Sequence, residues 1–318
     1  MKKLTTVSLL LVIIIFGSIL WWANGISPVN SANKQPVIFV VQKGAGLKEI
    51  STKLETAGLI KNRIIFFLYA RFGKFEGKIQ AGDFRLSPSM STSEIAQNLT
   101  HGTLDVWTTI PEGKRGTEIA EILKEKIPTY DSSWPLSLTQ NEGYLFPDTY
   151  LIPKDASIAS IVTQMKNNFE QKYQSLDTSK TKLSKDEIVK LASLVEREAK
   201  FEEDRPLVAS VLLNRFGIGM KLDIDATVQY LLGYSTDEKT WWRKNITFAD
   251  LEISSPYNTY RNAGLPPTPI ANPGIEAMRA VISPADTNFV YYISDSAGNL
   301  HFAKTLNEQN ANIKKFGL

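Results

Sequence analysis

The sequence contains no cysteine among its 318 residues and only two histidines, His101 and His301. The absence of cysteine excludes a thiol nucleophile, a thiolate metal site and a disulfide framework, and it leaves the redox compartment open. With two histidines, neither a histidine-rich metal centre nor a Ser-His-Asp relay is expected. The remaining options are carboxylate chemistry without a metal or other cofactor, or no chemistry at all.

Long blocks of like charge are also missing. The formal net charge of +3 arises from 36 basic and 33 acidic residues that are interspersed along the chain, so we expect no nucleic-acid partner. With 43% hydrophobic and 22% charged residues, the composition is that of an ordinary globular protein. The length predicts two soluble modules.

The N-terminus carries the clearest physical signal in the sequence. Lys2 and Lys3 precede an uncharged stretch over residues 4–24, which ends near Trp21 and Trp22. This pattern predicts a transmembrane anchor with a cytoplasmic tip, because lysines favour the inner side and tryptophans favour the interface. The body of the protein would then face the extracytoplasmic side.

A cleaved signal peptide is the alternative interpretation of this segment, since Ala23 or Ala32 could end a cleavage site. The long apolar run and the bulky tryptophans favour the retained anchor. Residues 25–36 are polar and contain prolines, which indicates a linker.

A short pattern occurs three times, beginning at Glu49, Glu94 and Glu118, and each copy places an isoleucine and a leucine four residues apart. The first and third copies follow a β-like stretch and a glycine turn, and the second follows GDFRLSPSM (residues 82–90) and opens with a capping box, so we expect small strand-helix units. These units could simply be amphipathic helices with a common core pattern. Alternatively, VVQKGAGLKEISTKLETAGLI (residues 40–60) resembles the first strand, turn and helix of LysM domains, which bind peptidoglycan; the likeness covers residues 37–102.

The helix predicted from Ser184 to about Phe201 begins with a capping box formed by Ser184 and Glu187. Glu196 and Glu198 fall on opposite edges of its apolar stripe. Glu198 follows larger aliphatic neighbours, and their desolvating effect would raise its pKa toward that of a general acid. Two glutamates beside an apolar stripe can equally be a solvated helix edge.

Two further helices are expected over residues 204–220 and 222–233, followed by two loops rich in aromatic and polar residues, 239–252 and 254–274. Aromatic faces and amide or hydroxyl tips suit carbohydrate binding. The same composition also fits a loop stiffened by proline.

These segments together resemble the MltG (YceG-like) family of endolytic murein transglycosylases. The resemblance includes the anchor and the LysM-like region, and its motifs occur in the same order over nearly the whole chain. The motifs are EGYLFPDTY (142–150), LASLVEREAKFEEDRPLVASVLLNRFGIGMKLDIDATVQY (191–230), SPYNTYRNAGLPPTPIANPG (255–274) and FVYYISDSAGNLHFAKTLNEQN (289–310).

The resemblance implies an α+β protein in which an anchor and a LysM-like βα module precede a mostly helical, lysozyme-like catalytic domain with a small β part. The expected divisions are an anchor at 1–24, a linker at 25–36, a LysM-like module with an extension at 37–127, and a catalytic domain at 128–318.

The resemblance identifies Glu198 as the catalytic residue, with Glu196 as a structural or supporting partner. The family cleaves the β-1,4 bond between N-acetylmuramic acid and N-acetylglucosamine, leaving 1,6-anhydro ends. One carboxyl group is enough, because the muramyl C6 hydroxyl replaces water as the nucleophile and Glu198 serves as acid and then base.

The substrate itself is expected to contact the SPYNTY loop. We expect Tyr257, Asn258 and Thr259 to hold the muramyl sugar, with Glu142 and Asn214 as further cleft residues.

The resemblance also implies cutting of nascent peptidoglycan strands at the inner membrane, ending their elongation beside synthases such as penicillin-binding proteins. Two other functions remain open. One is a non-enzymatic peptidoglycan-binding scaffold; the other is a muramidase, which would require a second carboxylate.

Overall fold

The computed structural model describes residues 2–100 and 105–316, and it describes side chains from Ile13 onward. His101 and the end of the predicted LysM-like region, residues 101–102, lie outside the described residues. The chain divides into two compact units, one with Met1–Trp107 and Leu151–Asp155 and the other with Thr108–Tyr150 and Ala156–Leu318. Residues 108–127, which we expected in the first module, therefore belong to the second unit.

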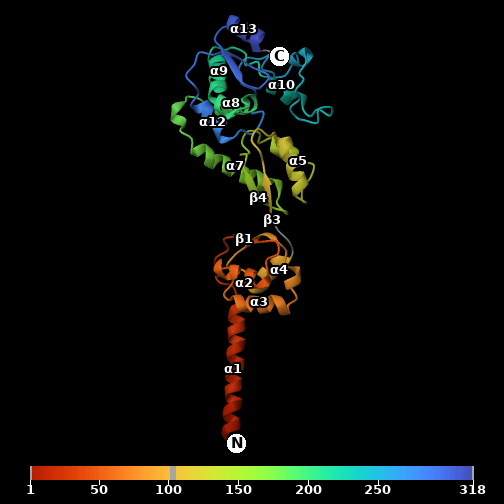
Figure 1. Ribbon diagram of the computed structural model, residues 1–318, viewed down its shortest axis with the longest axis vertical. Helices are drawn as coiled ribbons and strands as arrows, with labels where there is room; N and C mark the ends of the chain where they lie inside the picture. The colour runs from red at the N-terminus through yellow and green to blue at the C-terminus, as the bar shows by residue number, and fades with distance from the viewer. Residues whose placement is uncertain (1, 101–104, 317–318) are drawn as a thin grey trace. The chain divides into compact units, whose positions relative to one another are not determined.

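The first unit contains one long helix, several short helices and two complete strands (Figure 1). Its elements are α1 (Lys2–Ile26), β1 (Val37–Val41), α2 (Leu47–Thr56), α3 (Arg63–Phe72), the 3-10 turn η1 (Glu76–Lys78), β2 (Gly82–Leu86) and α4 (Thr92–Thr100). The strands pair antiparallel with Phe39 opposite Phe84, so β1, α2, α3 and β2 form a β-α-α-β arrangement. Phe66 and Leu99 complete a buried core with these two rings.

The described part of α1 carries exposed apolar side chains between Ile13 and Trp21. In the part of the chain that the structure describes, no helix combines the length and hydropathy needed to cross a membrane. The side chains of residues 2–12, which form the first half of the predicted anchor, lie outside the description. The anchor stays a prediction.

The second unit contains most of the helices, and a β-hairpin precedes its last helix. Its elements are β3 (Asp105–Thr109, shared with the first unit), α5 (Gly116–Lys126), α6 (Trp134–Thr139), β4 (Thr149–Pro153, also shared), α7 (Ile158–Gln174), η2 (Thr178–Lys180), α8 (Lys185–Glu198), η3 (Glu202–Asp204), α9 (Arg205–Gly217), α10 (Asp225–Leu232), α11 (Phe248–Leu251), α12 (Ile275–Ile282), β5 (Tyr291–Ser294), β6 (Leu300–Ala303) and α13 (Leu306–Phe316). Strands β3 and β4 pair with each other, as do β5 and β6. The α+β class is confirmed.

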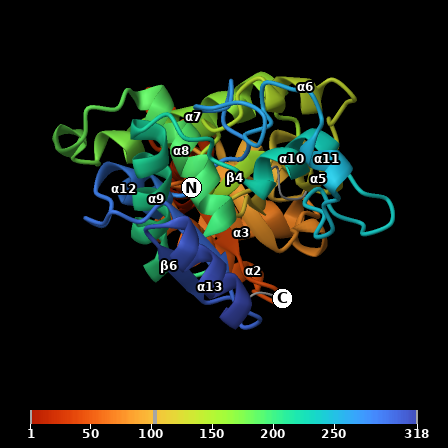
Figure 2. The ribbon, with the colours of Figure 1, turned by 90° about the horizontal axis from the view of Figure 1, so that it is seen from above.

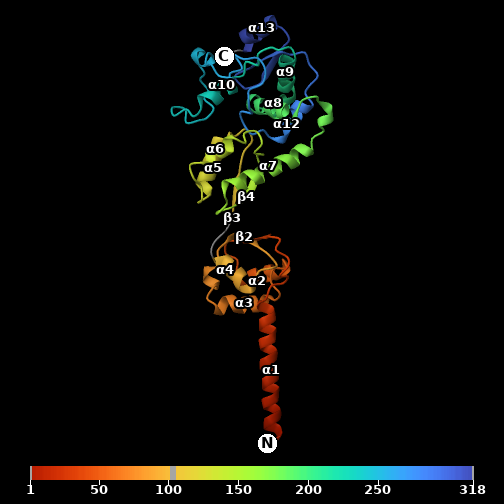
Figure 3. The ribbon, with the colours of Figure 1, turned by 180° about the vertical axis from the view of Figure 1, so that it is seen from behind.

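The core of the second unit lies between α8, α9 and α12, which pack side by side (Figure 2). Leu191, Leu194 and Val195 of α8 are fully buried there against Leu212 and Met278. Burial of each such side chain contributes roughly 1.5–3 kcal/mol, so α8 is held firmly along its apolar face. Helices α5 and α6 form a separate pair within the same unit (Figure 3).

Helix α8 begins as predicted, because Ser184 and Glu187 cap each other's backbone N–H groups. It ends at Glu198, earlier than the predicted Phe201, because Ala199 adopts an extended conformation with ψ of 106°. Glu198 is therefore the last helical residue, where the negative end of the helix dipole disfavours a carboxylate.

Candidate active site

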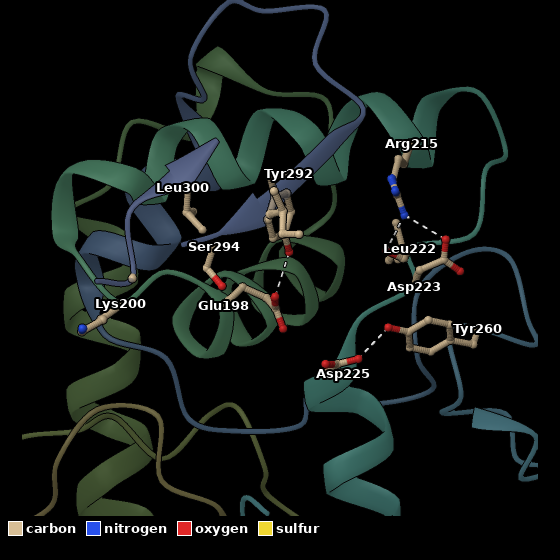
Figure 4. A pocket seen from close by; sticks show the side chains of 12 residues that line it. Glu198, Lys200, Arg215, Leu222, Asp223, Asp225, Tyr260, Tyr292, Ser294 and Leu300 are labelled. Atoms are coloured by element: carbon tan, nitrogen blue, oxygen red, sulfur yellow. Dashed lines mark hydrogen bonds and ion pairs between the residues drawn. The ribbon is translucent and has the colours of Figure 1, made fainter. Parts of the chain in front are cut away.

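A pocket of about 380 Å³ opens at the C-terminal end of α8 (Figure 4). Its walls come from α8, α9, α10, the loop after α11 and the β5–β6 hairpin. The lining residues are Glu198, Lys200, Arg215, Leu222, Asp223, Asp225, Tyr260, Tyr292, Ile293, Ser294, Gly298 and Leu300. Three of these residues are acidic, and two are basic.

Glu198 is partly buried and points into this pocket, where its Oε2 accepts a hydrogen bond of 2.8 Å from the hydroxyl of Tyr292 (Figure 4). Burial raises the pKa of Glu198, and the charge of Asp225 raises it further. The bond from Tyr292, a backbone bond from Ala226 and the charge of Arg197 act in the opposite direction. A carboxyl group with a raised pKa is suited to donate a proton near neutral pH.

Two more carboxylates line the pocket from the start of α10. Asp225 is the first residue of that helix, and its Oδ1 accepts a bond of 2.5 Å from the hydroxyl of Tyr260. Asp223 forms an ion pair with Arg215, with 3.1 Å between Nη1 and Oδ2. The two aspartates therefore differ, since only Asp223 has a cationic partner among the described side chains.

Asn214, predicted to bind substrate, does not line the pocket. Its amide donates to the carbonyl oxygens of Thr287 and Phe289, at 2.8 and 2.9 Å. On the next residue, Arg215 donates from Nε to the carbonyl of Val290. These bonds fix the chain that enters β5, and β5 carries Tyr292 to Glu198.

The structure places the three predicted residues of the SPYNTY loop away from the pocket lining. Asn258 is 0% exposed and donates to the carbonyls of Leu251 and Ile253, while Thr259 is 2% exposed and accepts from the backbone of Ile224. The hydroxyl of Tyr257 lies 2.7 Å from that of Thr268.

These three residues shape the loop that presents the next one, Tyr260, to the pocket. The backbone N–H of Tyr260 donates to the side chain of Asn258, and its hydroxyl reaches Asp225. Tyr260 belongs to the motif that we singled out, although the prediction stopped one residue before it.

Glu196 and Glu142 lie in other surroundings than Glu198. Glu196 accepts from Arg205 Nη2 at 2.9 Å and from the backbone N–H of Gly274 at 3.0 Å. Glu142 is 4% exposed, and its Oε1 accepts from the backbone of Gly116 at 2.8 Å. Neither residue lines the pocket, so the structure brings only Glu198 among the predicted site residues into it.

Tyr292 and Asp225 are pocket residues that the sequence reasoning missed. Asp225 is the first residue of α10 and follows the N-cap Ile224. Tyr292 lies far along the chain from Glu198 in a segment without a recognisable catalytic spacing. Among the described side chains, no group of three or more acidic, histidine or cysteine residues is arranged to hold a metal ion.

A helical unit with a partly desolvated glutamate in a pocket of polar and aromatic residues has the features of a glycan-cleaving enzyme. The model of the YceG-like family matches residues 39–315. The chain belongs to the YceG-like family.

Relatives of known name agree with this assignment. An endolytic murein transglycosylase of Bacillus subtilis is 32% identical, with 96% of this chain and 91% of the relative covered. An endolytic murein transglycosylase of Streptococcus pneumoniae is 29% identical, covering 91% of this chain and 60% of the relative. A crystal structure of a YceG-like protein from Listeria monocytogenes has a TM-score of 0.56 and 31% identity, covering 87% of this chain and 99% of that one.

Proposed function

We propose that this protein is an endolytic murein transglycosylase that cleaves the β-1,4 bond between N-acetylmuramic acid and N-acetylglucosamine. The observation that carries the proposal is Glu198, which has a raised pKa and faces the pocket at the end of α8. The family to which the chain belongs and the two named relatives support the same activity.

The proposed reaction uses Glu198 twice and consumes no water. The carboxylic acid of Glu198 gives its proton to the glycosidic oxygen as the bond from the muramyl C1 to that oxygen breaks. The C6 hydroxyl oxygen of the same muramyl unit then bonds to C1, and its proton returns to Glu198. The products are a 1,6-anhydromuramyl end and a strand with a new free N-acetylglucosamine end.

The test is mass spectrometry of the products that the full chain makes from uncrosslinked glycan strands. We expect internal cleavage and anhydromuramyl ends, which are lighter than reducing ends by one water. Reducing ends instead would favour the muramidase, for which Asp223 and Asp225 offer additional carboxylates in the pocket. Binding without any product would favour the scaffold.

The proposal extends to the first unit and to the location of the enzyme. The β-α-α-β arrangement of β1, α2, α3 and β2 supports a LysM-like module that holds peptidoglycan. The exposed apolar side chains of α1 support an anchor in the cytoplasmic membrane, with the enzyme on its outer side. In that position it would end the elongation of nascent strands beside penicillin-binding proteins.

Substitution of Tyr292 by phenylalanine is expected to extend activity to higher pH. The hydroxyl of Tyr292 favours the ionised form of Glu198, so its removal raises the pKa of Glu198 and keeps the acid protonated further into the alkaline range. The maximal rate should fall by less than about tenfold, as expected for the loss of one hydrogen bond. The measurement is the pH profile of kcat/KM, and an alkaline limb that stays in place or moves to lower pH would contradict the assignment.

A further inference from the structure

Asp225 is an acidic side chain in the Glu198 pocket that the single-acid mechanism leaves without a role. It stands at the start of α10, and Figure 4 shows its carboxylate and that of Glu198 on facing walls of the pocket. Among the described side chains, none of the lysines or arginines forms an ion pair with Asp225, whereas nearby Asp223 is paired with Arg215. Of the two aspartates in the pocket, Asp225 is therefore the one without a cationic partner among the described side chains.

Two features fix the position and the electrostatic surroundings of the Asp225 carboxylate. The hydroxyl of Tyr260 donates to Oδ1 over 2.5 Å, and this bond orients the carboxylate. The N-terminus of α10, an eight-residue helix, adds the positive end of a helix dipole at the same point. The backbone N–H of Tyr260 donates to the side chain of Asn258, so the fold of the loop fixes the position from which Tyr260 reaches Asp225.

We propose that Asp225 is a second catalytic residue, an anionic group that stabilises the positive charge on the muramyl ring as the glycosidic bond breaks. Departure of the leaving oxygen makes C1 and the ring oxygen electron-poor, as in an oxocarbenium ion. A fixed carboxylate with no cationic partner lowers the energy of that state more than the energy of the neutral ground state. Asp225 forms no bond and transfers no proton in this role, so the proton balance of Glu198 is unchanged.

The same geometry gives Asp225 an effect on Glu198 itself. The charged and titratable groups around Glu198 are Arg197 on α8, Asp223 and Asp225 before and at the start of α10, Arg215 on α9, Tyr260 on the loop, Tyr292 on β5 and Lys200 after α8. The negative charge of Asp225 raises the pKa of Glu198. Asp225 therefore adds to the larger effect of burial, and both favour the protonated form of Glu198.

The decisive variant is Asp225→Asn, which removes the charge and keeps the shape. With the full chain and uncrosslinked glycan strands, we expect kcat to fall about 100-fold while KM changes less than about threefold, as for other losses of transition-state charge stabilisation. The alkaline limb of the pH profile should move to lower pH, opposite to the shift expected for Tyr292→Phe. Asp223→Asn is the matched comparison, because it removes a carboxylate of the same pocket that already has an arginine partner. The fall in kcat in Asp223→Asn should be several times smaller than that in Asp225→Asn.

Tyr260→Phe tests the role of Asp225 independently if Asp225→Asn folds poorly. It removes only the hydroxyl that orients Asp225, so we expect a fall in kcat of about tenfold with little change in KM. The proposal is overturned if Asp225→Asn keeps its kcat within about threefold of the wild type or changes only KM. It is also overturned if kcat falls as much in Asp223→Asn as in Asp225→Asn. Release of reducing ends by the wild type, abolished in Asp225→Asn, would also overturn it, because Asp225 would then be a base for water.

This inference rests on the proposed function, and the two can fail separately. If the wild type makes no anhydromuramyl ends, the proposed function fails. If the wild type makes them and Glu198→Gln does not, but Asp225→Asn is fully active, only the role of Asp225 fails.

Discussion

Glu198→Gln is expected to abolish anhydromuramyl products, with kcat reduced by at least about 1,000-fold. Glutamine has the shape of the acid but carries no proton that it can give to the leaving oxygen. Its amide oxygen can still accept the bond from Tyr292, so the pocket should keep its form. The measurement is the rate of product formation by the full chain, together with its thermal unfolding temperature as a check on folding.

Glu196→Gln is the matched control, since it changes a glutamate two residues away on the same helix. Glutamine keeps an oxygen for the backbone N–H of Gly274 but loses the ion pair with Arg205. We expect a less stable protein whose activity per folded molecule stays within about threefold. Loss of product in Glu196→Gln with activity retained in Glu198→Gln would reverse the assignment of the two residues.

Local signals in the sequence were sufficient to predict the helix that carries the acid. Ser184 and Glu187 mark its start because the capping box depends only on residues three apart. The apolar stripe likewise predicts which face packs into the core, and Leu191 and Val195 are fully buried there. The preference for Glu198 over Glu196 came from the neighbours on the same helix. Burial raises the pKa of both glutamates, and the structure separates them by position, because Glu198 lines the pocket and Glu196 does not.

The partners of Glu198 were not predictable in the same way, because they depend on contacts between distant segments. Tyr292 reaches Glu198 only because the β5–β6 hairpin folds over the end of α8, and Asn214 helps to place that hairpin. The composition of the SPYNTY loop gave no indication that Asn258 and Thr259 would bond the backbone while Tyr260 faces the pocket. Polar residues in a loop can bind a ligand or hold the loop, and composition does not distinguish the two.

The boundary between the two units also depends on contacts that the local sequence does not predict. The strand-helix unit beginning near Asp105 repeats the pattern of the units before it, so periodicity grouped it with them. In the structure its helix α5 packs against α6, and Arg115 at its start stacks on the ring of Tyr230, with 4.2 Å from its Cζ to the ring centroid. These contacts join residues 108–127 to the second unit, and periodicity carries no information about such pairing.

Glu142→Gln is expected to stabilise the protein at alkaline pH and to flatten the dependence of its stability on pH. Burial raises the pKa of Glu142 from 4.5 to about 8, outweighing the opposing effects of the Gly116 backbone bond, the Arg115 charge and the Asn272 bond. Between these two pKa values the unfolded chain loses a proton that the folded chain keeps. The free energy of unfolding of the wild type therefore falls as the pH rises from about 4.5 to about 8, by about 4 kcal/mol from this group alone.

Glutamine does not titrate, and its amide oxygen can accept the same bonds from Gly116 and Asn272 that Glu142 accepts. Urea unfolding of both proteins at several pH values isolates the contribution of Glu142, because every other titrating group is common to the two. The difference in unfolding free energy should grow in favour of the variant up to about pH 8 and then level off. A constant difference across this range would show that Glu142 is already ionised in the folded protein. Activity that survives the substitution would separate this buried group from substrate binding, the role that the sequence had suggested for it.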